Sequence, residues 1–261
     1  MLATPLWAIK RYRRFVDRRQ GSAVALLYHR IIDDDSPDPE QLGITSQLFE
    51  SHIAMIARSF ATPSLATVCR SLHEGARIDA SSVCITLDDG YRDNFEKALP
   101  VLQRYGVPAT FFVATLPLEG GTFFWDEGIY DDTTDLYVTR EKLREAAENP
   151  LVTIGAHTHR HHRLSNLTKD GAQADIAHNV GILTDLCGYT PRLFAYPFGT
   201  PESYTPETIE VIRSFGFEGA FTTTYGTIHA KRDRALLMRY SPGIQDAESL
   251  QAVLHAYFGT V

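Results

Sequence analysis

Residues 83–90 read VCITLDDG, a short apolar run that ends in two adjacent carboxylates and a glycine. The run is rich in β-branched and aliphatic side chains and is too short for a helix, which predicts a buried strand. Six more short runs have this apolar character, at 23–28, 109–114, 151–156, 193–196, 218–223 and 236–240. The sequence therefore predicts about seven strands, and the pair Asp88 and Asp89 directly follows one of them.

Helical patterns lie between these runs. Apolar residues recur with helical spacing at 46–59, behind a cap at Thr45 or Ser46. Similar stretches lie at 92–105, 139–148, 169–187, 206–214 and 247–257. Strands that alternate with helices imply parallel pairing through crossover connections. About seven such units in 261 residues fit a (β/α) barrel or a doubly wound sheet, in one α/β domain.

Two segments depart from this alternation. Residues 117–137 are rich in Gly, Asp and aromatic residues without a clear period. We expect an inserted loop there, which is either a lid over a site or a plain surface insertion. Residues 1–21 are predicted to form a basic, helical leader, because the first 20 residues hold six cations and one anion. The barrel is then expected over residues 22–261.

The composition limits the classes of function. The chain is 44% hydrophobic and 22% charged, which is typical of a globular protein. Its net charge is −7, and the basic leader leaves the rest of the chain more acidic still. Nucleic-acid binding is not expected, because it normally requires a basic face. The sequence contains no run of about 18 apolar residues, so no membrane span is predicted.

The basic leader has two interpretations that stay open. Its cations are not followed by the roughly 7–15 apolar residues of a signal peptide, so we expect a cytoplasmic protein. The leader is then either a solvated helix or a peripheral contact with the inner membrane through residues 1–20. Trp7 and Phe15 lie among the arginines and favour the second interpretation.

The carboxylate pair is the sharpest chemical feature. Two carboxylates at the end of a buried strand are costly unless a cation, a metal or a proton-transfer role stabilises them. Neighbouring strand residues point to opposite sides, so Asp88 and Asp89 can serve different purposes. The alternative is an ordinary exposed Asp-Gly turn.

A histidine-rich segment, HTHRHHRL at 157–164, directly follows the run 151–156. His157 and His161 are four residues apart, which lets two imidazoles reach one metal where the chain turns. His159 and His162 are not needed for this pairing. A solvated polar loop is the alternative.

Two weaker motifs also follow predicted strands. RLFAYPFGTP at 192–201 is a strand that leads into a turn, which can present backbone N–H groups to a substrate oxyanion. YHR at 28–30 places His29 after the first strand. Alone, each motif is more typical of structural roles.

Together these motifs indicate chemistry, because all of them follow strand ends. In a (β/α) barrel the active site lies at that rim. One Asp and two His leave an open position for water on Zn²⁺ or a similar metal, which lowers the pKa of that water. A second Asp can take the proton, and a His can protonate the leaving group. The sequence thus indicates metal-dependent hydrolysis of an amide or ester.

These residues resemble the polysaccharide deacetylases of the NodB-homology family, carbohydrate esterase family four. TLDDG is similar to the family's usual TFDDG, which implies Asp88 as the catalytic base and Asp89 as a metal ligand. His157 to His161 is similar to the second motif, H-[ST]-x-x-H, which implies both histidines as ligands. The resemblance covers roughly residues 22–245. It implies a distorted (β/α) barrel of about seven parallel strands, related to the TIM barrel.

The sequence departs from the family pattern in two places. FAYPFG at 194–199 is similar to the third motif, but the usual Arg, which orients the base, is Ala195. Arg239, at the end of a late predicted strand, is our candidate replacement. Leu254-His255 is no convincing match for the C-terminal leucine-histidine motif, because it lies in an amphipathic helix.

The N-terminal motif offers a substitute for that missing histidine. YHR resembles the subgroup of poly-N-acetylglucosamine deacetylases, in which an early His supplies the acid; this implies His29. FFWDE at 123–127 resembles a loop of deacetylases of surface-polysaccharide biosynthesis. Its Trp125 either stacks on a sugar face or anchors the loop.

The resemblance implies a metal-dependent N-deacetylase of a polymeric or lipid-linked N-acetylated sugar, from a surface polysaccharide or its precursor. The metal is expected to be Zn²⁺, with Co²⁺, Mn²⁺ or Ni²⁺ as alternatives. The Phe198 N–H is expected to stabilise the oxyanion. The expected substrate-binding residues are Tyr196, Pro197, Phe198, Trp125 and Arg239.

Two alternative functions stay open at this point. The same site could serve a deformylase or an O-acetyl esterase. A catalytically inactive carbohydrate-binding barrel is the second alternative, because the third-motif Arg and the C-terminal histidine motif are missing. Oligomeric state is not predicted.

Overall fold

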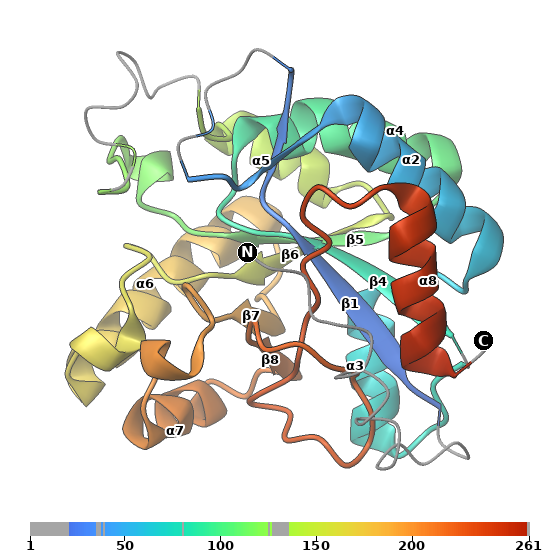
Figure 1. Cartoon of the computed structure of the whole chain (residues 1–261). Coiled ribbons are helices and arrows are strands. Elements are labelled where there is room, and N and C mark those ends of the chain that lie inside the picture. The colour runs from blue at the N-terminus through green and yellow to red at the C-terminus, as the bar shows by residue number, and fades with distance from the viewer. Residues whose placement is uncertain are drawn as a thin grey trace.

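A computed structural model describes residues 21–34, 38, 40–79, 81–124, 126 and 136–259, and the structural statements below concern these residues. Six parallel strands form the central sheet in the order β1-β4-β5-β6-β7-β8 (Figure 1). Their bounds are Ala23–Tyr28 (β1), Ser82–Leu87 (β4), Ala109–Val113 (β5), Val152–Ala156 (β6), Leu193–Ala195 (β7) and Gly219–Phe221 (β8). The curled parallel sheet with helices around it confirms the predicted distorted (β/α) barrel class.

The segment predicted as a seventh strand, 236–240, is not a regular strand. It lies between β8 and β1, where Leu237 bridges to Phe221 and Tyr240 bridges to Leu26, both in the parallel sense. Backbone hydrogen bonds of 2.8 and 2.9 Å join the segment to both strands. The segment changes partner within four residues, and it links the two edges of the sheet.

Helices surround the sheet at the predicted places. They are α2 (Ser46–Ser59), α4 (Leu99–Tyr105), α5 (Arg140–Ala147), α6 (Lys169–Cys187), α7 (Pro206–Ser214) and α8 (Ala247–Phe258). The predicted helix at 92–105 begins as the π-helix η2 (Asn94–Ala98), which α4 continues. Helix α3 (Leu65–Glu74) was not predicted. Short elements complete the fold: β2 (Arg30–Ile32), β3 (Gly43–Thr45), and the 3-10 turns η3 (Pro117–Glu119), η4 (Leu164–Asn166) and η5 (Pro201–Ser203).

Local sequence signals explain where the helices start and stop. The Thr45 hydroxyl accepts the Leu48 N–H at the start of α2, as the capping pattern predicts. Thr168 caps α6 in the same way, and α6 ends at Gly188 with φ +74°. Glycine adopts this left-handed conformation without the strain that a Cβ atom would add.

The core lies on both faces of the sheet. Every residue of β1 and β4 is buried, as expected for parallel strands covered on two sides. Helices α2 and α8 pack side by side along one flank (Figure 1). In the described part of the chain, no helix has the length and apolar character needed to cross a bilayer. The predicted leader at 1–20 lies outside the described residues, as do Trp125 and residues 127–135 of the predicted insertion.

Candidate active site

Side chains at the carboxyl ends of four strands meet around one pocket. His29 follows β1, Asp88 and Asp89 follow β4, His157 follows β6, and Tyr196 follows β7. All five line a pocket of about 420 Å³. Parallel strands end at the same edge of the sheet, so residues far apart in the chain converge there, as the rim argument predicts.

His157, His161 and Asp89 form a tight buried triad. The Nε2 atoms of His157 and His161 lie 3.2 and 3.1 Å from Oδ1 of Asp89, and 3.1 Å from each other. All three side chains are buried. The spacing of the histidines predicted that they pair, and the family resemblance implied Asp89 as their partner; the structure brings the three side chains together.

The donor set fits a divalent metal. The Nδ1–H of His157 donates to the Ala195 carbonyl at 2.8 Å, so a neutral His157 ring turns its Nε2 lone pair to the triad. Tetrahedral zinc with bonds of about 2.0–2.1 Å holds its donors about 3.3 Å apart, close to the spacing here. A cation between these atoms would offset the repulsion of their lone pairs. Asp89, His157 and His161 can therefore hold a metal with one position left open.

The geometry of Asp89 suits it to this place. Its backbone has φ +74°, a conformation that non-glycine residues rarely adopt and that tends to persist at functional sites. Burial on its own raises the pKa of the carboxyl, but His161 and His157 beside it hold the pKa well below its usual value. This environment favours the ionised form of Asp89, which is the form that a metal ligand needs.

Asp88 points to a different partner. Its Oδ1 and Oδ2 accept two hydrogen bonds from Nη1 and Nη2 of Arg239, both of 2.7 Å. Nε of Arg239 donates to the Thr222 carbonyl at 3.1 Å, which fixes the plane of the guanidinium. Asp88 also lies 4.0 Å from Nε2 of His157. The two adjacent aspartates thus have separate environments, as their alternation along the strand predicts.

The place of Arg239 corrects one expectation. Arg239 was predicted both as a substitute for the missing third-motif arginine and as a substrate-binding residue. Arg239 is fully buried behind Asp88 and is not part of the pocket wall, because its donors are turned inward to Asp88 and Thr222. It is placed to orient Asp88, and the structure does not place it against a substrate.

The turn after β7 brings Phe198 to the site. The Gly199 N–H donates to the Pro197 carbonyl at 2.7 Å, and Phe198 between them has φ +60°. This is a classic γ-turn, which is rare and strained. Phe198 lines the pocket, and its ring lies 5.1 Å from the ring of His161. Pro197 does not line the pocket, and Tyr196 donates its hydroxyl to the Ala235 carbonyl.

His29 is held by residues of the helix after the aspartates. Nδ2 of Asn94 donates to the His29 carbonyl. Next to it, Nε of Arg30 donates to Asp93 at 3.2 Å, and Asp93 also accepts the Ile31 N–H at 3.1 Å. Asp93 and Asn94 were not predicted, although they lie only three and four residues after the aspartate motif ends at Gly90.

Another residue that was not predicted, Asn179 of α6, supports the histidine loop. Its Oδ1 accepts the His157 N–H at 3.1 Å, and its Nδ2 donates to the Val113 carbonyl at 3.0 Å. Asn179 therefore joins the ends of β5 and β6 at the site. Its spacing of 22 residues from His157 follows no local pattern, so sequence alone gave no signal for it.

Other expected residues lie elsewhere. His159 and His162 take no part in the buried triad, as predicted. His255 lies in α8, where its ring packs 5.2 Å from Phe60, in agreement with the packing interpretation of Leu254-His255. The pocket wall contains further residues that were not predicted: Glu40, Leu42, Phe124, Arg163, Thr200, Thr223, Tyr225 and Ser241.

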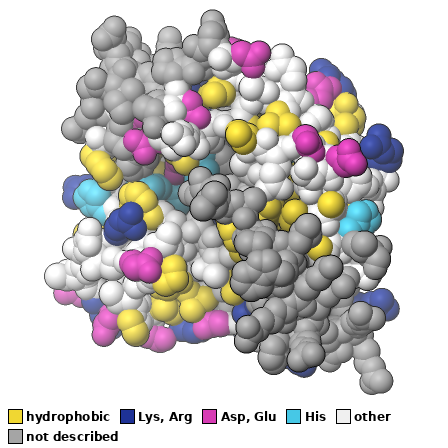
Figure 2. Space-filling view, viewed as in Figure 1, with side chains coloured by type: hydrophobic (Ala, Val, Ile, Leu, Met, Phe, Trp, Pro, Cys, Tyr) yellow, Lys and Arg dark blue, Asp and Glu magenta, His cyan; other side chains and the backbone are white. Residues whose placement is uncertain are grey.

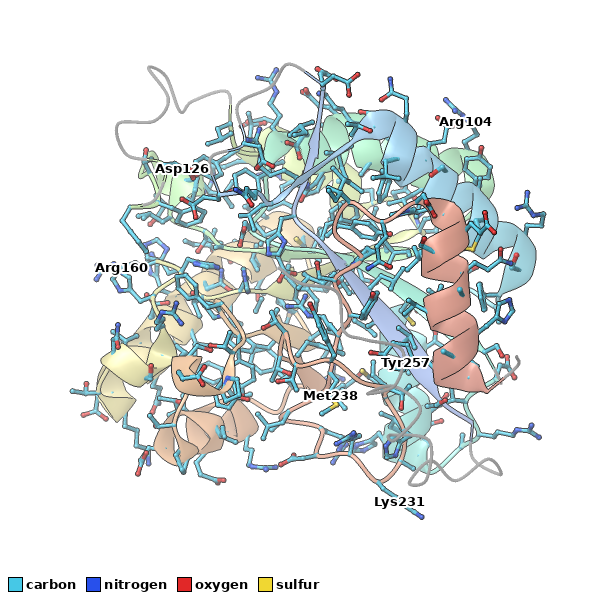
Figure 3. The ribbon with its side chains drawn as sticks, viewed as in Figure 1. Arg104, Asp126, Arg160, Lys231, Met238 and Tyr257 are labelled. Atoms are coloured by element: carbon cyan, nitrogen blue, oxygen red, sulfur yellow. The ribbon has the colours of Figure 1, made fainter. Side chains whose placement is uncertain are left out.

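The face seen in Figure 2 shows histidine side chains beside apolar and basic side chains at its left edge. In Figure 3, Arg160 marks the histidine loop on that side, and Asp126 marks the described end of the inserted segment above it. Asp126 accepts a hydrogen bond from the Tyr137 hydroxyl, which joins two described parts of the predicted insertion to each other.

Comparison with known proteins agrees with this geometry. The family model described as polysaccharide deacetylase matches residues 76–220. YxkH of Bacillus subtilis (strain 168) is 27% identical over 226 residues, covering 84% of this chain and 71% of that protein. The poly-beta-1,6-N-acetyl-D-glucosamine N-deacetylase of Escherichia coli (strain K12) is 22% identical over 242 residues, covering 80% of this chain and 35% of that one. The chain thus spans about a third of the E. coli relative.

Solved structures share the fold. The deacetylase PplD of Streptococcus pyogenes, in complex with acetate, superimposes with a TM-score of 0.74 at 20% identity, covering 89% of this chain and 98% of that one. The family match includes Asp88, Asp89, His157 and His161, the residues that meet in the pocket. This chain belongs to the polysaccharide deacetylase family.

Proposed function

We propose that this protein is a metal-dependent hydrolase that removes the N-acetyl group from an N-acetylated sugar of a surface polysaccharide or its precursor. The observation that carries the proposal is the double use of the aspartate pair. Asp89 completes a metal-ligand triad with two histidines, while Asp88 is held by Arg239 beside it. The name of the E. coli relative supports an N-acetylglucosamine polymer as the substrate class.

The metal supplies Lewis acidity and a lower pKa for water when it is bound. Its ligands are Asp89, His157 and His161, and the His₂Asp donor set favours Zn²⁺, with Co²⁺, Mn²⁺ or Ni²⁺ as alternatives. Metal analysis of the purified protein identifies the ion. A zinc-free protein that gains activity only with another of these ions would overturn the assignment of zinc.

The other roles belong to side chains and backbone of the chain. Asp88, fixed by Arg239, accepts the proton of the attacking water. The Phe198 N–H, at the turn beside His161, donates to the oxyanion that develops on the acetyl group. His29 lines the same pocket and protonates the departing amine. These roles divide base, oxyanion donor and acid among three strand ends.

The shape of the pocket suits a sugar chain. Its wall combines the apolar faces of Leu42, Phe124 and Tyr225 with the charged ends of Glu40 and Arg163. Such mixed walls suit a sugar ring, which has apolar faces and polar edges. A neighbouring hollow of about 430 Å³ shares part of this wall and continues along 241–245. Two adjoining hollows with a shared wall favour a polymeric substrate over a single sugar.

Two alternative functions have less support than N-deacetylation. A deformylase or an O-acetyl esterase would use the same residues, and the name of the E. coli relative favours N-deacetylation. An inactive carbohydrate-binding barrel was motivated by the missing third-motif arginine. Arg239 occupies the position next to the base that such an arginine would serve, so this motive is weaker.

A substrate panel tests the proposal. Oligomers of N-acetylglucosamine, their N-formyl analogues and O-acetylated sugars are incubated with the zinc-loaded protein, and acetate and formate are measured. We expect acetate from the N-acetylated oligomers, a matching mass loss in the product, and little release in the variant His161→Gln. Faster formate release would favour a deformylase, faster O-acetyl cleavage an esterase, and no release from any substrate a binding protein.

We also propose that residues 1–20 contact an anionic membrane surface, at the cytoplasmic side. Six cations and one anion with interspersed apolar residues support this. Co-sedimentation with vesicles containing anionic lipid compares the full chain with a variant lacking residues 1–20. Equal binding of the two proteins would refute the proposal.

A further inference from the structure

A second group of metal-ligating side chains lies outside the active-site pocket. It consists of Glu119, His159 and His178, whose ligand atoms all lie within 4.8 Å of one another. Nε2 of His178 is 3.0 Å from Oε2 of Glu119, and Nε2 of His159 is 3.7 Å from the same oxygen. The rings of His159 and His178 are 4.4 Å apart at a steep angle. None of the three residues has a role in the proposed reaction.

The three residues come from three elements that meet here. Glu119 belongs to η3, at the start of the predicted inserted loop. His159 lies in the histidine loop after β6, and His178 lies on α6. Arg160, labelled in Figure 3, marks where the loop passes beside α6. Metal sites typically have ligand atoms that converge from several elements, because each element then fixes the position of one ligand.

The scaffold holds His159 in place without any metal. Oδ1 and Oδ2 of Asp175 accept the His159 and Arg160 N–H groups at 2.7 and 3.3 Å. Nδ1 of His159 lies 3.1 Å from the Thr115 hydroxyl, which leaves Nε2 turned to Glu119 and His178. A histidine whose second nitrogen is anchored in this way is typical of a metal ligand.

An ordinary surface ion pair explains this arrangement less fully. The contact between Glu119 and His178 is half exposed, and such pairs contribute little to stability. A simple pair would not require the buried ring of His159, whose Nε2 also faces the carboxylate. Zinc would hold the three donors about 3.3 Å apart, and the distances of 3.0 and 3.7 Å lie on either side of that value.

We propose that Glu119, His159 and His178 form a second site for a borderline-soft divalent cation such as Zn²⁺. Two imidazoles and one carboxylate are zinc ligands, and the partly exposed position leaves room for a water as the fourth ligand. Binding there ties η3 to α6 and to the loop that carries His157 and His161. The site therefore links the start of the predicted inserted loop to the proposed catalytic centre.

Zinc stoichiometry after equilibrium dialysis tests the proposal. We expect two equivalents in the wild type, one in His178→Gln, one in Glu119→Gln and two in the matched control His162→Gln, an exposed histidine of the same loop. The variant His161→Gln, which disrupts the buried triad, is expected to retain one. Circular dichroism checks that each variant is folded.

Thermal unfolding gives a second readout that needs no activity. Zinc should raise the Tm of His161→Gln, where only the second site remains, and should leave the Tm of His161→Gln/His178→Gln unchanged. His178→Gln with a loaded buried site should keep wild-type activity.

One equivalent in the wild type that His178→Gln and Glu119→Gln both retain would overturn the second site. Failure of the proposed function looks different. It would leave all substrates intact while His178→Gln still lowered the zinc content by one equivalent.

Discussion

Asp88 and Arg239 form a fully buried ion pair at the centre of the proposed site, 151 residues apart in the chain. Removing two charges from water is costly, and that cost is offset by the mutual attraction of the charges, by their two parallel hydrogen bonds and by the further hydrogen bonds from Arg239 to the Thr222 carbonyl and the Thr86 hydroxyl. Such a pair is weak evidence for stability by itself. The pair fixes the direction of the Asp88 carboxylate next to the proposed metal ligands.

The first prediction at the residue scale concerns this positioning role. Arg239→Lys keeps the charge but loses the bidentate hydrogen bonds to Asp88, so the Asp88 carboxylate should be misaligned. We expect kcat to fall by roughly 10- to 100-fold with little change in KM and no change in zinc content. The same substitution in an Asp88→Asn background should have no further effect on kcat. A fall in zinc content, or a pure KM effect, would assign Arg239 a different role.

The second prediction concerns stability. Arg239→Met leaves the Asp88 carboxylate buried without its partner, so the free energy of unfolding should fall by about 3–5 kcal/mol. Urea denaturation measures this. The control is Arg104→Met, at the exposed pair with Glu50 (labelled in Figure 3), where the change should stay within about 1 kcal/mol. If Arg239→Met and Arg104→Met lost similar amounts of unfolding free energy, the burial of an unpaired charge could not explain the loss in Arg239→Met.

At the scale of elements, most helices and strands follow from local patterns. The strand at 83–87 and the helix at 46–59 lie where apolar periodicity and the Thr45 cap placed them. Helix α3 carried similar signals and was overlooked, with a Ser64 cap at its start and Gly75 at its end. The π-helix η2 has no comparable sequence signal.

The contacts between elements could not be predicted in the same way. The segment 236–240 has the composition of a strand, but it changes partner from β8 to β1 and so forms only isolated bridges. That change of partner carries Arg239 onto Asp88. The residues within each motif could be predicted because they are close in sequence. Arg239 was named as the partner of Asp88 only because of the family resemblance. Asn179 had no local sequence signal.

The third prediction concerns the turn after β7. Gly199 has φ +63°, and a Cβ atom there would lie 2.6 Å from the Thr223 nitrogen. Gly199→Ala therefore combines backbone strain with a clash, and it should displace Phe198 and lower kcat/KM. In addition, strain at this φ should cost about 1–3 kcal/mol of unfolding free energy.

Gly188→Ala is the matched control for that turn. Gly188 has φ +74° at the end of α6, but a Cβ atom there would meet nothing within 4 Å. We expect a loss of about 1–2 kcal/mol and unchanged kcat/KM. Equal kcat/KM in the two variants would mean that the Phe198 turn does not contribute to catalysis.

At the scale of the whole molecule, the barrel brings residues that are distant in the chain together at the carboxyl ends of its strands. Strand β1, which pairs with β4, leads directly to His29 near the start of the chain. The closing segment between β8 and β1 carries Arg239, near the end of the chain, onto Asp88. The stability of the barrel and the occupancy of the metal site should therefore be coupled, since the triad spans β4 and the loop after β6.

The fourth prediction tests that coupling. Chelation should lower the Tm and abolish activity, and Zn²⁺ should restore both, because an ion that binds only the folded state stabilises it by about 2.7 kcal/mol at 100 times its Kd. His178→Gln is the background of choice, because the buried triad is then the only proposed site. An unchanged Tm after metal removal would separate folding from metal binding.

The most direct test of the account is the variant Asp88→Asn. Asparagine keeps nearly the same shape and can still accept a hydrogen bond from Arg239, but it cannot take a proton from water. Zinc content, circular dichroism and acetate release from N-acetylglucosamine oligomers are measured side by side with the wild type. We predict a folded, zinc-loaded protein whose acetate release falls by roughly 10²–10⁴-fold. Wild-type acetate release by that variant would contradict the role of Asp88 and the mechanism built on it.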